Sequence, residues 1–124
     1  MSLLSRLWPR LTALLLADAG ARVIKVERPD GDFARGYDAG ANGQSSIFAW
    51  LNRGKESICL DLKDKTDIDV ICRMFPRADV FVSNLAPRAV ARMGLDGSSL
   101  RVTNPGLTCV TITGYREAAD KKAY

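Results

Sequence analysis

Arg22-Val-Ile-Lys-Val-Glu27 is a short β-branched run with alternating character, and this pattern predicts a β-strand. Upstream of it, Leu11, Leu14 and Leu15 follow helical spacing, and Gly20 is a residue that commonly ends a helix. The basic start of the chain, its short apolar stretch and the Ala-Asp-Ala sequence at residues 17–19 also imitate a weak signal peptide. Because a strand follows at once, the pattern favours an amphipathic helix that ends at Gly20.

Three more strands are predicted downstream, at residues 57–62, 79–82 and 107–113. Helices are predicted at residues 46–51, 67–75, 88–93 and 98–102, with Thr66 as the cap of the second of these and Pro76 as its end. Residues 29–45 are rich in Gly, Asp, Ala and Asn, and they predict a long loop with no packing face.

The alternation of strands and helices predicts an α/β fold with a parallel sheet. Ligands of such sheets bind beyond the carboxyl ends of the strands. The residues expected at those ends are Arg28, Lys63, Asn84 and Gly114-Tyr115.

The composition is that of one soluble globular domain, or part of one. The chain has 124 residues, of which 47% are hydrophobic and 26% charged, and its net charge is +4. Basic residues are scattered among acidic ones, which argues against a nucleic-acid partner and favours a phosphorylated small molecule. The longest apolar run near the N-terminus, residues 14–17, is far shorter than the roughly 20 residues that span a bilayer, so no membrane partner is expected.

The chain contains no histidine, which excludes Ser-His-Asp and Cys-His catalysis and the commonest metal ligand. An odd number of cysteines without CxxC spacing predicts reduced thiols in a cytoplasmic protein and no metal site. No nucleotide-binding glycine fingerprint is present, and residues 31–36 favour a plain loop over a phosphate loop. The residues predicted to be small or aromatic parts of the core are Cys59, Cys72, Cys109, Phe48 and Trp50.

Several segments, taken in chain order, resemble one family. They read Leu16-Ala-Asp-Ala-Gly-Ala-Arg-Val-Ile-Lys-Val-Glu-Arg-Pro29 with Gly31-Asp-Phe-Ala-Arg35, Leu51-Asn-Arg-Gly-Lys-Glu-Ser57 with Leu60-Asp-Leu-Lys63, Ala78-Asp-Val-Phe-Val-Ser-Asn84 with Pro87 and Arg92-Met-Gly-Leu95, and Asn104-Pro105 with Thr111-Ile-Thr-Gly-Tyr115. From about Leu16 to Tyr124, the chain resembles the class III CoA-transferases, also called the carnitine dehydratase and bile-acid-inducible protein F family. Each motif is weak alone, but their order and spacing together are specific.

The resemblance implies a Rossmann-like CoA-binding domain, of which residues 1–124 would be a part, in a cytoplasmic homodimer with interlocked subunits. It implies transfer of CoA between an acyl-CoA and a free carboxylic acid, with CoA as substrate and no tightly bound cofactor. In this family an aspartate attacks the thioester, giving a mixed anhydride and then an enzyme–CoA thioester. Such a nucleophile divides one difficult acyl transfer into easier steps.

The resemblance also implies which residues contact CoA. Cations among them suit its phosphates. The implied contacts are Arg28 after the first strand, Leu60 and Lys63 at the nucleotide end, Asn84 after the third strand, Arg92 as a phosphate partner, and Lys122 before Ala123-Tyr124.

Three departures from the family pattern bear on function. Residues 1–15 do not match the strand and turn with which the family begins, so those contacts are expected to be lost. Ser83, Leu85 and Arg88 stand where the family has glutamate, an aromatic residue and glycine. No aspartate, Asp96 and Asp120 included, matches the motif of the nucleophile, so no catalytic residue is assigned. The chain is therefore expected to be the N-terminal part of a longer enzyme and to be inactive alone.

Two alternatives remain open at this point. An acyl-CoA racemase would need a histidine as its acid and base, and Tyr124 stands where that residue would fall, with an ordinary pKa too high for a base at neutral pH. A non-catalytic remnant that binds CoA or a nucleotide is the other alternative. Without the rest of the family's fold, we expect an exposed sheet edge and apolar face, and hence aggregation or dimerisation.

Overall fold

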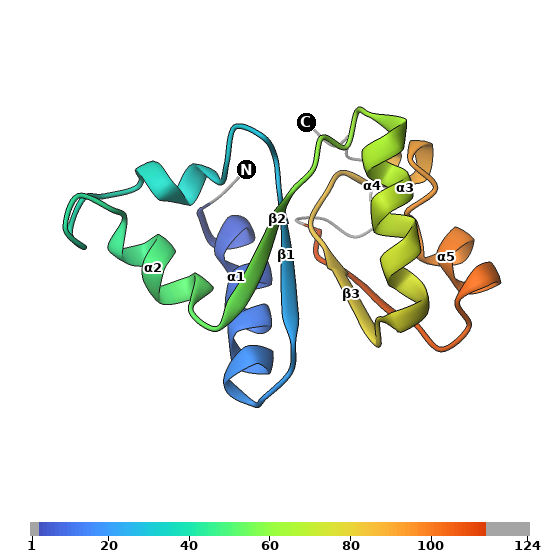
Figure 1. Ribbon diagram of the computed structural model, residues 1–124, viewed down its shortest axis with the longest axis horizontal. Coiled ribbons are helices and arrows are strands. Elements are labelled where there is room, and N and C mark those ends of the chain that lie inside the picture. Colours follow the sequence, from blue (N-terminus) through green and yellow to red (C-terminus); the bar gives the residue numbers. More distant parts are fainter. Residues whose placement is uncertain (1–2, 114–124) are drawn as a thin grey trace. The chain divides into compact units, whose positions relative to one another are not determined.

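A computed structural model of the chain describes the backbone of residues 3–113 and the side chains of residue 7 and residues 9–113. Gly114-Tyr115, Lys122 and Tyr124, which the sequence singled out, lie outside the described residues. The chain divides into two compact units (Figure 1). The first unit is Arg10–Met74, and the second unit contains residues 75–113 together with the residues that precede Arg10.

The first unit is built around a pair of parallel strands, β1 and β2, with a register that runs from Val23↔Lys55 to Glu27↔Cys59. Helix α1 lies along these strands (Figure 1), and the Nζ of Lys55 donates a hydrogen bond of 2.8 Å to the carbonyl of Arg10 in that helix. In chain order the elements are α1 (Leu3–Asp18), β1 (Val23–Glu27), the 3-10 helix η1 (Phe33–Gly36), α2 (Ser46–Asn52), β2 (Lys55–Cys59) and α3 (Lys65–Met74).

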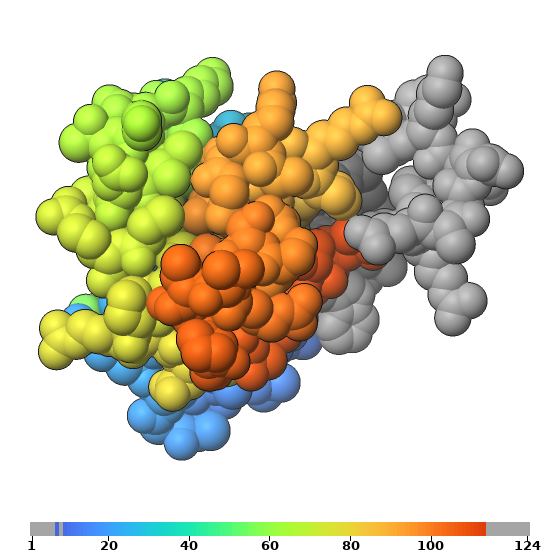
Figure 2. All heavy atoms as spheres, turned by 90° about the vertical axis from the view of Figure 1, so that its right-hand side faces the viewer, coloured from blue at the N-terminus to red at the C-terminus, as the bar shows by residue number. Residues whose placement is uncertain are grey.

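The second unit is built around another parallel pair, β3 and β4, in register from Val80↔Thr108 to Ser83↔Thr111. Helix α5 begins against β4, because a Cβ at Gly97 would come within 3.2 Å of the Cβ of Cys109. Figure 2 shows the residues of α4 and α5, in orange, side by side on one surface of this unit. The elements are the 3-10 helix η2 (Phe75–Arg77), β3 (Val80–Ser83), α4 (Pro87–Arg92), α5 (Gly97–Thr103) and β4 (Thr108–Thr111).

The predicted α/β class is confirmed, and all four predicted strands exist in parallel pairs. The second strand lies earlier than predicted, because the chain turns after Cys59 instead of extending to Leu62. The following helix ends at Met74, before Pro76, as predicted. Its predicted cap was wrong: the helix begins at Lys65, and an Oδ1 of Asp64 accepts a hydrogen bond of 2.8 Å from the backbone of Thr66.

The loop at residues 29–45 has the packing contacts that its composition did not predict. Within it, Ala34 of η1 is fully buried and Ser45 is 1% exposed. The carboxylate of Asp38 accepts hydrogen bonds from the backbone of Gly40 at 2.9 Å and of Ser46 at 2.8 Å. Hydrogen bonds of polar side chains hold this segment together, so apolar periodicity could not predict its structure.

Each unit has its own small core. The predicted burial of Trp50 is wrong, since its side chain is 56% exposed, and Phe48 is half-buried. On α2 the inward positions are Phe48 and Leu51, three residues apart, and Trp50 lies off that face. Cys59 and Cys72 are exposed and Cys109 is half-buried, so the predicted burial of the cysteines is also wrong. The buried apolar residues are Leu14, Ala34, Leu51, Leu60 and Ile71 in the first unit, and Phe75, Val90, Leu95, Leu100 and Leu107 in the second.

Within residues 3–113, none of the helices is long and apolar enough to cross a membrane.

Candidate functional site

The carboxyl ends of β1 and β2 bring two predicted site residues together. The last register pair is Glu27↔Cys59, so Arg28 and Leu60 are the first residues beyond neighbouring strands. The backbone N–H of Leu60 donates a hydrogen bond of 2.9 Å to the carbonyl of Glu27, which extends the ladder by one bond. We call this edge, with the segments Arg28–Phe33 and Leu60–Lys63, the β1/β2 edge.

Arg28 is exposed at this edge and lies over an aromatic ring. Its carbonyl accepts a hydrogen bond of 2.8 Å from Gly31, which closes a turn with Pro29 in the second position. Gly31 has a φ of +81°, a conformation that a residue with a Cβ adopts rarely. The Cζ of Arg28 lies 4.2 Å from the centroid of the Phe33 ring. A planar cation is thus presented to solvent at the end of β1.

Leu60 and Lys63 occupy the turn that follows β2. The backbone N–H of Lys63 donates to an Oδ1 of Asp61 at 2.9 Å, and that of Asp61 donates to an Oδ2 of Asp67 at 2.7 Å. The side chain of Leu60 is 6% exposed and belongs to the core, so a ligand at the edge would meet its backbone. Lys63 is exposed.

A cluster of paired charges lies beside the edge, on the side of β1 that faces α1. The carboxylate of Asp32 binds the Nη2 of Arg10 and the Nζ of Lys25, each at 2.6 Å. Burial by itself would raise the pKa of Asp32, but hydrogen bonds from Arg10, Lys25 and the backbone of Ala34 hold the pKa well below its usual range. Burial first, and then the nearby positive charges of Lys25 and Arg10, lower the pKa of Lys55 to about 8.

Glu27 is the second carboxylate of this cluster and is buried. It binds Arg35 at 3.2 Å and Lys25 at 3.3 Å, and it accepts a hydrogen bond of 3.0 Å from the hydroxyl of Ser57. Burial would raise its pKa, but Lys25, Ser57 and Arg35 together lower the pKa below its ordinary value. Lys25 and Arg35 also lie over the ring of Phe48, at 4.6 and 4.1 Å from its centroid. Lys25 and Arg35 therefore already bind carboxylates of the protein and lie over the ring of Phe48.

Arg28 and Lys63 differ from the cations of that cluster. Among the side chains of residue 7 and residues 9–113, neither forms an ion pair. An exposed cation without an internal counterion can bind an anion without first breaking an ion pair. The β1/β2 edge is therefore suited to an anionic ligand.

Asn84 and Arg92 lie in the second unit. Asn84 is exposed directly after β3, where the backbone N–H of Leu85 donates a hydrogen bond of 3.2 Å to the hydroxyl of Ser83. Arg92 is exposed at the last position of α4. The structure therefore brings Arg28 and Leu60 together at one edge, places Lys63 in the turn that follows β2, and places Asn84 and Arg92 within a separate unit.

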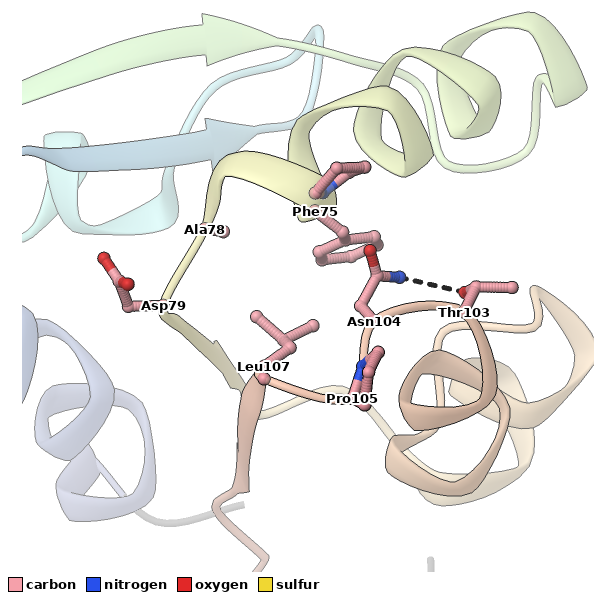
Figure 3. A pocket seen from close by; sticks show the side chains of 9 residues that line it. Phe75, Ala78, Asp79, Thr103, Asn104, Pro105 and Leu107 are labelled. Atoms are coloured by element: carbon pink, nitrogen blue, oxygen red, sulfur yellow. Dashed lines mark hydrogen bonds between the residues drawn. The ribbon is translucent and has the colours of Figure 1, made fainter.

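A hollow of about 370 Å³ lies at the opposite, amino ends of β3 and β4 (Figure 3). Figure 3 shows that the Asp79 carboxylate points away from Phe75, Asn104 and Pro105, and that Asn104 bonds to Thr103 over 2.9 Å. Among the described residues that line the hollow, Asp79 carries the charged side chain and points away, which makes the hollow a poor candidate for binding an anion. Over the part of the chain that the structure describes, no group of three His, Cys, Asp or Glu residues could hold a metal ion.

Sequence reasoning missed the aromatic and acidic supports of the edge. Neither Phe33 nor Asp32 is among the site residues predicted from the sequence, although both stand in the family segment Gly31-Asp-Phe-Ala-Arg35. Asp32 caps η1, because its Oδ1 accepts a hydrogen bond of 2.9 Å from the backbone of Ala34. Its residue type is a local signal from which this cap could have been predicted. Its contacts with Arg10 and Lys25 join segments apart in the sequence and carried no local signal.

The first unit thus combines an α/β fold with exposed cations after two parallel strands, and comparison with known proteins identifies the family. The sequence model of CoA-transferase family III matches residues 8–124, so the chain belongs to that family. The match includes residues 8–15, for which the sequence motifs predicted no likeness.

Relatives with curated names are longer than this chain. It is 38% identical over 111 residues to acetyl-CoA:oxalate CoA-transferase of Acetobacter aceti. The aligned region covers 89% of this chain and 28% of that relative. It is 40% identical over 109 residues to succinate–glutarate CoA-transferase of Agrobacterium fabrum. Here the aligned region covers 82% of this chain and 27% of that relative. The chain thus spans little more than a quarter of the length of these relatives.

Solved structures show the same fold. A CAIB/BAIF family protein from Brucella suis matches with a TM-score of 0.82 and 32% identity, over 89% of this chain and 30% of its own. A hypothetical protein from Mycobacterium tuberculosis matches with a TM-score of 0.81 and 32% identity, over 90% of this chain and 31% of its own.

Proposed function

We propose that this chain carries a CoA-binding part of an enzyme that transfers CoA between an acyl-CoA thioester and a free carboxylic acid. Family membership supports the class of enzyme, and the named relatives are CoA-transferases for oxalate and for succinate and glutarate. One observation carries the assignment to this part of the chain: Arg28 and Lys63 lie exposed at the β1/β2 edge, and neither pairs with a carboxylate among the side chains that the structure describes. CoA offers phosphate groups that such cations bind.

The proposed reaction proceeds through an aspartyl–CoA thioester. A carboxylate attacks the thioester carbonyl and the CoA thiolate leaves, which produces a mixed anhydride. The thiolate then attacks the enzyme's side of that anhydride, and the first acid leaves as its carboxylate. The acceptor acid then attacks the aspartyl–CoA thioester, and the same steps in reverse order transfer CoA to this acid and restore the aspartate. No aspartate of this sequence matches the nucleophile, so we infer that the chain alone does not perform the exchange.

Asn84, Arg92 and Lys122 are proposed as further CoA contacts on the strength of the family motifs. We also propose that the functional protein is a cytoplasmic homodimer, as the resemblance implies. The absence of histidine favours transfer over racemisation, because the racemase reaction requires an acid and base near neutral pH.

Calorimetric titration of the full chain with CoA tests this proposal. Replacing Arg28 with Ala is expected to weaken binding roughly ten- to a hundredfold, because a charged hydrogen bond contributes about 1.5–3 kcal/mol. The loss should be smaller with dephospho-CoA if Arg28 binds the 3′-phosphate.

Arg22→Ala is the matched control, since it removes the same charge from the amino end of β1, where Arg22 pairs with Glu56 at 2.7 Å. Equal affinity of the unmodified chain and Arg28→Ala would remove Arg28 from the site. Failure of the folded chain to bind CoA would contradict the proposal, and CoA exchange by the chain alone would contradict its inferred inactivity.

A further inference from the structure

The aromatic ring beneath Arg28 is a feature of the β1/β2 edge that no motif explains. The guanidinium carbon lies 4.2 Å from the centroid of the Phe33 ring, and Phe33 is 58% exposed. A side chain with this exposure contributes little to the core. Its contact with a cation at a candidate anion site therefore suggests a role at that site.

The backbone on both sides of the ring is anchored. On one side, the turn closed by the 2.8 Å hydrogen bond from Gly31 to Arg28 returns the chain toward the end of β1. On the other side, Asp32 caps η1 through the backbone of Ala34 and is itself held by the two cations described above. The backbone that carries Phe33 is thus held on both sides, and the guanidinium of Arg28 lies over its ring.

We propose that Phe33 is a positioning residue for Arg28, and that the stacked guanidinium presents its edge to a phosphate group of CoA. Stacking uses the face of the guanidinium and leaves N–H donors in its plane for a bidentate contact with phosphate oxygens. Restricting the arginine before the ligand arrives reduces the side-chain entropy lost on binding. This inference rests on the proposed function, because it takes CoA as the ligand.

Calorimetric titration of the full chain with CoA compares two replacements of the ring. Phe33→Leu is expected to weaken binding about two- to fivefold, the range expected for an exposed cation–π contact. Phe33→Tyr keeps the ring and should retain the original affinity. Trp50→Leu is the matched control, because it removes another exposed ring, from α2, and should leave the affinity unchanged.

A double-variant cycle separates positioning from direct contact. If Phe33 acts through Arg28, then Phe33→Leu causes no further loss in a chain that already carries Arg28→Ala. An equal loss in both backgrounds would mean that Phe33 contacts CoA itself, and this would overturn the positioning role. Unchanged CoA affinity in Phe33→Leu would overturn it as well.

A readout without ligand keeps the two proposals distinguishable. The ring should shift the NMR signals of the Arg28 side-chain protons, and Phe33→Leu should abolish that shift whereas Trp50→Leu should not. Loss of CoA binding in Arg28→Ala but not in Phe33→Leu would overturn the inference alone. A chain that shows the ring shift and binds no CoA would overturn the proposed function, and with it the phosphate role of the stacked arginine.

Discussion

Lys25 and Arg28 lie three residues apart, yet the structure uses their charges differently. Lys25 is directed toward Asp32 and Glu27, with distances of 2.6 and 3.3 Å, and it is largely buried. Arg28 lies beyond the end of the strand and rests on Phe33 in solvent. Lys25 therefore supports the fold, whereas Arg28, three residues later, is available to a ligand.

Asp32 is expected to govern the acid stability of the first unit. Its folded-state pKa is lowered, so its contribution is present above the unfolded pKa of about 4 and is lost as the pH falls below that value. Asp32→Asn should lower the free energy of unfolding by about 3 kcal/mol at pH 7, because it leaves Arg10 and Lys25 without a shared counterion.

Urea unfolding between pH 2 and pH 7 measures this effect. The unmodified chain should lose stability more steeply below pH 4 than the Asp32→Asn variant. Asp30→Asn is the control, since Asp30 is an exposed carboxylate in the neighbouring turn. If both variants lose equal stability, the assigned role of the Asp32 cluster is wrong.

At the scale of elements, helix α3 shows why its type could be predicted and its first residue could not. Ile71 of α3 and Phe75, the first residue of η2, are buried four residues apart, and this spacing predicts a helix from the sequence alone. Asp64 and Thr66 are both plausible caps by residue type. The backbone turn after β2 selects Asp64, whose Oδ1 lies 2.8 Å from the backbone nitrogen of Thr66.

Replacing each of these two residues tests the observed cap. Asp64→Ala should lower the free energy of unfolding by about 1 kcal/mol, the usual value for loss of a side-chain cap. Thr66→Ala should change it by no more than about 0.5 kcal/mol, as for an ordinary surface position. Urea denaturation provides both values, and a larger loss in Thr66→Ala would restore the cap that the sequence predicted.

At the scale of the whole molecule, apolar side chains remain exposed on the strands. Ile24 and Val26 of β1 are 39% and 38% exposed, and in the second unit Val80 of β3 and Val110 of β4 are 45% and 37% exposed. Alternation along β1 directs Lys25 and Glu27 to the charged cluster and leaves Ile24 and Val26 on the other face. Exposed apolar strand faces promote association between chains.

The isolated chain is therefore expected to self-associate, and sedimentation velocity over a range of concentrations measures this. Replacing Ile24 and Val26 together with Thr keeps β-branched residues while removing apolar surface, and it should shift the population toward monomer. Val102→Thr, at an exposed position of α5, is the control and should have little effect. A monodisperse monomer with a sharp cooperative melt would contradict this prediction.

The sequence alone determined the parallel α/β class, the order of strands and helices, and the cations that follow β1 and β2. Those features depend on local periodicity and on where each strand ends, and both are encoded in adjacent residues. Only the tertiary structure decided that Asp32 binds Arg10 and Lys25, that Trp50 faces solvent, and that Phe33 lies beneath Arg28. The pairing of Asp32 and the exposure of Trp50 depend on which faces of separate elements meet. The contact of Phe33 with Arg28 depends on the path of a turn. No spacing of residues in the sequence specifies that path or the way the faces of separate elements meet.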